Sequence, residues 1–152
     1  MAVNPLPRVL CVDDDEDSRE MLSVLLKFWR IETKGVGTAT QALSLIEAEH
    51  FDLYLLDTWL PDLDGVELCR RMRALDPHTP ILFFSGAAYE ADKKRGIEAG
   101  ANAYVIKPDV DGLIGTITQL VSHAEGPPPP KQCALVVSRP NLRHQSTCSK
   151  LV

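Results

Sequence analysis

Acidic residues stand at the points where two apolar runs of the sequence stop. The run that begins at Phe51 stops at Asp57, and the run Val9–Val12 stops at Asp13 and Asp14. Short apolar runs before a polar turn are typical of strands buried on both faces of a parallel sheet. Because open α/β sheets bind ligands at the carboxyl ends of their strands, we expect these three carboxylates to meet at one point.

Three carboxylates at one point are a site for a hard cation. Two such groups about 4 Å apart repel by roughly 4 kcal/mol at an effective dielectric constant near 20, so they do not all stay ionised unaided. Mg²⁺ relieves this repulsion, and it usually takes one or two carboxylates together with water and phosphate oxygens. The cluster of Asp13, Asp14 and Asp57 therefore predicts phosphate chemistry that depends on Mg²⁺.

Two further polar residues follow apolar runs in the same way. Ser85 comes after the run 81–84, and Lys107 comes after the run 103–106. A short strand around 32–36 completes a set of five, of which only this one lacks a polar functional group at its end. Four such residues at successive strand ends indicate one site.

Apolar residues at helical spacing separate these strands. In the first expected helix the inner face holds Met21, Leu22, Leu25, Leu26 and Trp29. In the third, Val66, Cys69, Met72 and Leu75 lie on the inner face, whereas Arg70, Arg71 and Arg73 lie off it. Five strands that alternate with five helices predict a parallel sheet with right-handed crossovers and helices on both faces.

Composition sets the limits of this domain. The chain has 152 residues, is 45% hydrophobic and carries a net charge of −5. It contains no apolar run near the roughly 20 residues of a membrane span and no signal-peptide pattern at its start, so we expect a cytoplasmic protein without membrane contact. We assign residues 1–124 to one domain, whose acidic character disfavours direct binding of nucleic acid.

Residues 125–152 differ in character from the domain. Four consecutive prolines occupy 127–130, and the residues after them include four basic and no acidic side chains. We expect a proline-rich linker followed by a basic, flexible tail. Within that tail, the apolar stretch Cys133–Val137 could form a lone strand.

The ordered motifs resemble the receiver domain of bacterial two-component response regulators, and the resemblance covers about residues 7–123. Its carriers are Asp13-Asp14, Asp57 with Pro61 and Gly65, Ser85, Lys107-Pro108 and the stretch 98–108. The resemblance implies a flavodoxin-like, doubly wound α/β fold with a five-stranded parallel sheet in the order 2-1-3-4-5 and five helices. It also implies a cis Lys107-Pro108 bond.

The resemblance also implies roles for single residues. Asp57 would be the phosphoacceptor, taking a phosphoryl group from the phosphohistidine of a histidine kinase or phosphotransfer protein. Asp14, Asp57 and the backbone carbonyl of Trp59 would hold Mg²⁺, and Asp13 would assist directly or through water. Lys107 would pair with the phosphoryl oxygens.

The resemblance further implies a switch. Ser85 would donate a hydrogen bond to the phosphoryl group, and Tyr104 would turn inward with the Ser85 loop to change the contacts made with a downstream protein. Such a protein is not an enzyme beyond Mg²⁺-dependent self-phosphorylation and self-dephosphorylation. Bulky Trp59 and apolar Ala87, at positions that influence water access in the family, predict that the dephosphorylation is slow.

Two other interpretations were weighed. The first is a receiver-like interaction module that works without phosphate, although such a module is expected to lack the aspartates or the lysine that are present here. The second is an aspartyl phosphatase on a related fold, which usually has a second Asp two residues after the nucleophile, where this chain has Trp59. The stretch after the prolines is too short for an output domain, which predicts a stand-alone receiver. The alternative is that the sequence is a fragment of a longer chain.

Overall fold

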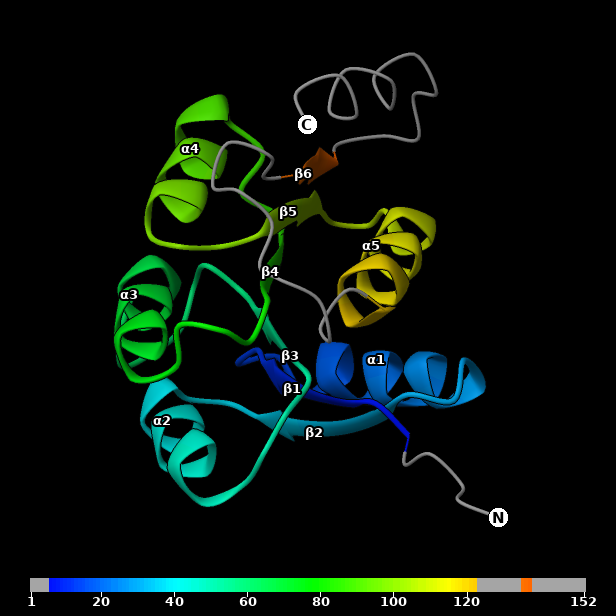
Figure 1. Ribbon diagram of the computed structural model, residues 1–152. Coiled ribbons are helices and arrows are strands. Elements are labelled where there is room, and N and C mark those ends of the chain that lie inside the picture. The colour runs from blue at the N-terminus through cyan, green and yellow to red at the C-terminus, as the bar shows by residue number, and fades with distance from the viewer. Residues whose placement is uncertain (1–5, 123–134, 138–152) are drawn as a thin grey trace.

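The computed structural model describes residues 6–122 and 135–137 and consists of one parallel sheet covered by five helices (Figure 1). The strands are β1 (Arg8–Val12), β2 (Glu32–Val36), β3 (Leu53–Leu56), β4 (Ile81–Ser85), β5 (Ala103–Ile106) and β6 (Leu135–Val137). The helices are α1 (Glu16–Phe28), α2 (Ala39–Ala48), α3 (Gly65–Leu75), α4 (Glu90–Glu98) and α5 (Val110–Ser122).

The strand order is β2-β1-β3-β4-β5-β6, and every neighbouring pair is parallel. The predicted order of the first five strands, 2-1-3-4-5, is therefore confirmed. The sheet nevertheless has six strands rather than five, because Leu135–Val137 pairs with Ala103–Val105 of β5. An edge strand offers unpaired backbone groups that a passing segment can bond. The other residues of the predicted linker and tail, 125–134 and 138–152, lie outside the described residues.

The sheet separates two hydrophobic cores. Figure 1 shows α2, α3 and α4 on one face of the sheet and α1 and α5 on the other. Side chains alternate between these faces along each strand, so Leu10 and Val12 of β1 join the first core while Val9 and Cys11 join the second. The central strands are buried on both sides, which explains their unbroken apolar sequences.

Local chemistry fixes the ends of the helices. Thr38 caps α2, since its hydroxyl oxygen accepts a hydrogen bond from the Gln41 amide at 3.2 Å. Asp64 caps α3 by accepting from the Val66 amide at 2.8 Å. Gly100 follows α4 with a φ of +119°, a conformation that favours glycine. The Lys107-Pro108 bond is cis, as predicted.

Helical spacing alone misplaced several side chains. Met21 and Trp29 of the first helical pattern are 47% and 55% exposed, and Leu75 is 54% exposed. The buried stripe of α1 is narrower than expected. Only Leu22 and Leu26 of this helix are fully buried, and both lie in the core between the sheet, α1 and α5. Among the described residues, no helix is both long and apolar enough to cross a bilayer.

Candidate phosphorylation site

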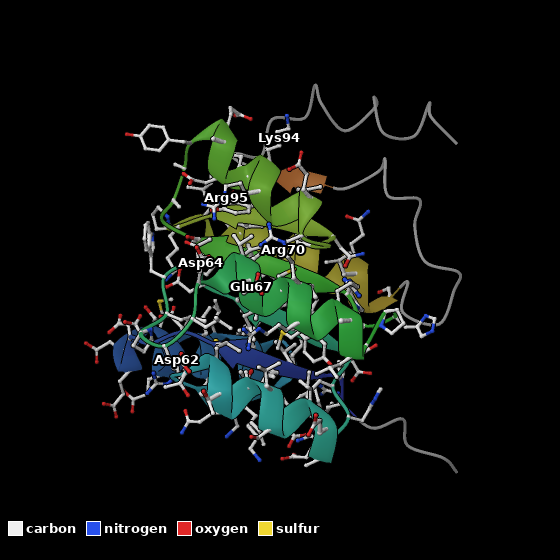
Figure 2. All side chains as sticks on the ribbon, turned by 90° about the vertical axis from the view of Figure 1, so that its left-hand side faces the viewer. Asp62, Asp64, Glu67, Arg70, Lys94 and Arg95 are labelled. Atoms are coloured by element: carbon white, nitrogen blue, oxygen red, sulfur yellow. The ribbon has the colours of Figure 1, made fainter. Side chains whose placement is uncertain are left out.

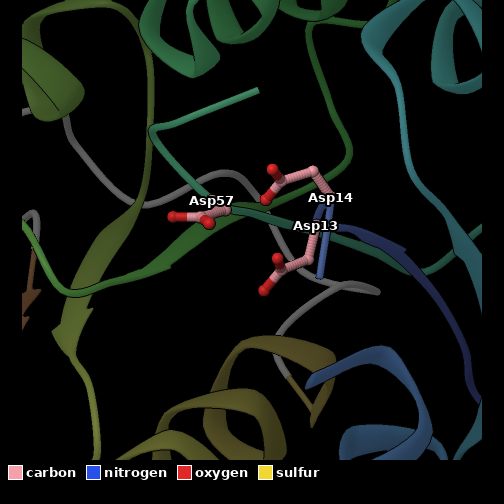
Figure 3. A group of neighbouring side chains, drawn as sticks. All are labelled: Asp13, Asp14 and Asp57. Carbon is pink, nitrogen blue, oxygen red and sulfur yellow. The ribbon is translucent and has the colours of Figure 1, made fainter. Parts of the chain in front are cut away.

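Three carboxylates meet where β1 and β3 end (Figure 3). Val12 and Leu56, the last residues of these strands, are partners in the sheet, and the Asp57 amide donates to the Val12 carbonyl at 2.9 Å. The residues that follow the two strands are thereby brought side by side. One carboxylate oxygen from each of Asp13, Asp14 and Asp57 lies within 4.8 Å of the other two. The three carboxylates thus lie close together, as the positions of the strand ends in the sequence predicted.

The environments of the three acids differ. Asp13 and Asp57 are buried, whereas Asp14 is exposed. Burial raises the pKa of Asp57; the positive charge of Lys107 and the backbone N–H groups of Thr58 and Trp59 oppose this rise, and the negative charge of Asp13 adds to it. Ionised Asp57 therefore depends on the positive charge near it.

Lys107 supplies that charge from the end of β5. Its Nζ atom lies 2.9 Å from Asp13 Oδ2 and 3.7 Å from Asp57 Oδ2. Partial burial lowers the pKa of Lys107, but the hydrogen bond with Asp13 and the charge of Asp57 outweigh it, so the net shift is upward. The ammonium is held charged within reach of two acids.

A group of buried hydroxyls lies at the end of β4. The Ser85 Oγ atom accepts a hydrogen bond from the Ala87 amide at 3.1 Å and shares one with the Thr58 hydroxyl at 2.5 Å. Tyr104 is completely buried, and its hydroxyl donates to the Ala87 carbonyl at 2.7 Å. Ser85 and Tyr104, both predicted switch residues, thus contact the same short segment at Ala87.

The loop between β3 and α3 is anchored on both sides of Trp59. A Cβ atom at Gly65 would collide with the Asp57 carbonyl and the Thr58 backbone, so the first turn of α3 packs directly against the backbone of Asp57 and Thr58. Asp62 accepts from the Ala39 and Thr40 amides at the start of α2, both at 3.0 Å. Hydrogen bonds from Thr40, then from the Ala39 amide, lower the pKa of Asp62 to about 2.

Charged side chains continue this anchoring along the outer face of α3. Figure 2 shows Asp62 and Asp64 in the loop, with Arg95 of α4 beside Asp64. The Arg95 Nη2 atom lies 3.4 Å from Asp64 Oδ2, and Arg70 pairs with Glu67 at 3.1 Å. The Trp59 side chain, by contrast, is 71% exposed. The loop is fixed by its acids while its indole faces solvent.

The donor set fits a magnesium ion. Clustered carboxylate oxygens are the ligands that Mg²⁺ prefers, and an exposed Asp14 leaves one side of the cluster open to water. The Lys107 ammonium already satisfies part of the negative charge of Asp13. Asp13, Asp14 and Asp57 are therefore the described residues whose carboxylates could hold such an ion.

Sequence reasoning missed two residues of the site. Thr58 follows Asp57 and contacts Ser85, and Arg19 of α1 donates to the Asp13 carbonyl at 2.7 Å. A signal existed for Thr58, since it follows a strand that neighbours the strand ending at Ser85. None existed for Arg19, whose contact depends on how α1 lies against the sheet.

Comparison with known proteins agrees with the resemblance to receiver domains. A family model described as the response regulator receiver domain matches residues 9–118. The DNA-binding response regulator MtrA of Mycobacterium tuberculosis is 39% identical over 101 residues, which cover 66% of this chain and 44% of that protein. The cell cycle response regulator CtrA of Brucella ovis is 34% identical over 120 residues, which cover 78% and 52%. The chain thus spans about half the length of these curated relatives.

Solved structures match over nearly their whole length. A CheY-like response regulator receiver domain protein from Methanospirillum hungatei superposes with a TM-score of 0.75 at 33% identity, over 79% of this chain and 97% of the other. The response regulator TrrA from Thermotoga maritima, in complex with Mg²⁺ and BeF, superposes with a TM-score of 0.70 at 26% identity, over 76% and 99%.

Proposed function

Because the chain belongs to the response regulator receiver family, we propose that Asp57 is a phosphoacceptor that takes a phosphoryl group from the phosphohistidine of a histidine kinase or phosphotransfer protein. The observation that carries this assignment is the position of Asp57, with its carboxylate 3.7 Å from the Lys107 ammonium and beside two further acids. A phosphate-independent interaction module does not require this arrangement of buried charged side chains.

The reaction requires little beyond positioning and charge neutralisation. A carboxylate oxygen of Asp57 forms a bond to phosphorus while the P–N bond to the donor imidazole breaks. The imidazole leaves with the electron pair of that bond. Lys107, held charged by Asp13 and Asp57, then pairs with the phosphoryl oxygens, and the Ser85 hydroxyl donates to another of them.

Asp14, Asp57 and the Trp59 carbonyl, with Asp13 directly or through water, are the residues we assign to a bound Mg²⁺. The ion supplies positive charge that offsets the charge of the carboxylates and the phosphoryl oxygens. The residues of the chain do the rest: Asp57 provides the nucleophile and Lys107 and Ser85 hold the product.

The signal leaves the site through Ser85 and Tyr104. Tyr104 is buried, with its hydroxyl donating to the Ala87 carbonyl, which is the inward position of this side chain. Phosphorylation of Asp57 would stabilise this position by drawing Ser85 toward the new charge. The balance between inward and outward Tyr104 would then set the contacts with a downstream protein.

The test is intact-mass measurement after incubation with Mg²⁺ and acetyl phosphate. We expect the wild type to gain the mass of one phosphoryl group and the variant Asp57→Ala to gain none. The matched control is Asp111→Ala, which removes an exposed acid on α5 and should still be phosphorylated. A wild type that binds Mg²⁺ but gains no mass would instead support the phosphate-independent module.

We infer also that the chain has no enzymatic activity beyond Mg²⁺-dependent self-phosphorylation and slow self-dephosphorylation. Support for the slow step comes from Ala87, which offers no polar side chain two residues after Ser85, and from the bulk of Trp59 two residues after Asp57. The Trp59→Asn variant should lose its phosphoryl group several times faster than the wild type. A wild-type lifetime of seconds that the substitution leaves unchanged would contradict the inference.

A further inference from the structure

Thr58 is held in a fixed place between the phosphoacceptor and Ser85. Its amide donates to Asp57 Oδ1 at 2.8 Å, and its carbonyl accepts from the Gly65 amide at 2.9 Å. The side chain is buried, and its hydroxyl lies 2.5 Å from Ser85 Oγ, an atom that is itself completely buried. The backbone of Thr58 is thus held on both sides, and its hydroxyl contacts Ser85.

The hydrogen-bond capacity of Ser85 gives this contact a direction. A serine hydroxyl has one hydrogen to donate and two lone pairs that accept. The Ala87 amide already occupies one lone pair. If Thr58 donates to the other, the hydrogen of Ser85 is left for a third group. If Ser85 donates to Thr58 instead, that hydrogen is consumed.

We propose that Thr58 is a positioning residue for phosphoryl binding, whose hydroxyl donates to Ser85 and so directs the Ser85 hydrogen toward the phosphoryl group on Asp57. This inference rests on the proposed function and adds a residue to it. The geometry of this hydrogen bond allows either hydroxyl to be the donor. Arrival of the phosphoryl oxygens selects the state in which Thr58 donates, because only then can Ser85 donate to the phosphoryl group.

The experiment compares two affinities of the full chain by calorimetry: that for Mg²⁺ alone, and that for BeF₃⁻, a phosphoryl mimic, at saturating Mg²⁺. The Thr58→Val variant keeps the shape of the side chain and removes its hydroxyl. We expect it to bind BeF₃⁻ about five-fold more weakly, the loss typical of one hydrogen bond, with unchanged Mg²⁺ affinity. The Thr58→Ser variant, which keeps the hydroxyl, should restore the wild-type affinity.

A second comparison separates positioning from simple packing. In a Ser85→Ala background, Thr58→Val should cause no further loss of BeF₃⁻ affinity, because the acceptor of the Thr58 hydroxyl is gone. An effect that persists in that background, a Thr58→Ser variant that fails to restore binding, or a Thr58→Val variant equal to the wild type would each overturn the inference. If Thr58→Val does not fold, Thr58→Ala removes the same hydroxyl and is read in the same way.

The two proposals fail differently. A wild type that binds BeF₃⁻ while Thr58→Val binds it equally well contradicts the role of Thr58 alone. A wild type that binds Mg²⁺ but not BeF₃⁻ contradicts phosphoryl binding at Asp57, and the role of Thr58 with it.

Discussion

In the proposed function, Lys107 has two tasks: its ammonium neutralises buried acids, and it would also pair with the phosphoryl group. It lies 2.9 Å from Asp13 and 3.7 Å from Asp57. A cation bound among the same carboxylates must share them with this ammonium. On the proposed function, the lysine would therefore compete with Mg²⁺ for negative charge, although both would serve the same reaction.

The Lys107→Met variant should separate these two effects. We expect a higher affinity for Mg²⁺, because Asp13 is no longer paired, and phosphorylation by acetyl phosphate slowed about 10²-fold, because a donor to the developing charge is lost. Titration with Mg²⁺ and the rate of mass gain measure the two. Lys107→Arg, which keeps the charge, is the control, and a fall in Mg²⁺ affinity on losing the lysine would contradict this account.

Asp76 shows the same coupling of charge and hydrogen bonding far from the site. It follows α3 and accepts from the Tyr54 hydroxyl at 2.8 Å and the Thr79 amide at 3.1 Å. Burial raises the pKa of Asp76, but the hydrogen bonds from Thr79 and Tyr54 outweigh it and lower the pKa from 3.8 to about 2. The folded state thus favours the ionised form.

This shift predicts a pH dependence of stability. Because the pKa of Asp76 is lower in the folded chain, its contribution is complete above pH 3.8 and is lost as the pH falls toward about 2. The Asp76→Asn variant should unfold with a free energy lower by about 2 kcal/mol near neutral pH, a difference that shrinks on acidification. Urea unfolding at several pH values measures it, with Asp111→Asn as the control. A difference independent of pH would contradict the assignment.

At the scale of the element, Arg73 ties the end of α3 to the strands beside it. Its guanidinium donates to the Gly100 carbonyl at 2.8 Å, to the Thr79 carbonyl at 2.7 Å and to Asn102 Oδ1 at 2.9 Å. The turn after α4 and the start of β4 are thereby fixed to one helix. A single side chain sets the relative position of three elements.

The Arg73→Met variant should lower the free energy of unfolding by about 2 kcal/mol, because several partly buried carbonyl groups lose a charged donor. Arg71→Met on the same helix is the matched control, since Arg71 is 54% exposed and its pairing with Glu67 is a surface contact. Denaturant unfolding of both variants decides the matter. Equal stabilities would show that the Arg73 network does not hold the elements together.

Arg73 also marks the limit of the sequence prediction. Helical spacing placed it off the inner face with Arg70 and Arg71, and spacing cannot show that a side chain turns back to reach distant carbonyl groups. The prediction for Trp29 was also wrong: helical spacing placed it on the inner face, but it is exposed. An apolar residue at the right spacing stays exposed when no neighbouring element covers it. Such contacts depend on how elements lie against each other.

The five strands and the meeting of the acids could be predicted because each follows from local patterns, whereas the order of the strands came from the resemblance to receiver domains. Apolar runs gave the five strands, and polar residues at their ends marked one edge of the sheet, where Asp57 and Lys107 now lie. The sixth strand was only suggested as a lone strand. Its partner could not be predicted, because pairing between segments some thirty residues apart leaves no periodic signal in either one.

At the scale of the whole molecule, β6 brings a segment from the later part of the chain beside the strand that carries Tyr104. Tyr104 and Val136 are partners in the parallel pairing. A chain that ends at residue 126 should therefore exchange the backbone amides of β5 several-fold faster in hydrogen-exchange measurements, while the opposite edge strand, β2, serves as an internal control. Unchanged exchange in β5 would show that the pairing adds no protection.

The same pairing makes the segment Leu135–Val137 a competitor that the protein carries within its own chain. Any partner that adds a strand to β5 must displace a segment whose local concentration is set by the connecting residues 123–134 and does not fall when the protein is diluted. Changing the number of connecting residues would then change how readily a partner can pair with β5. Such a change would leave the chemistry at Asp57 unaltered.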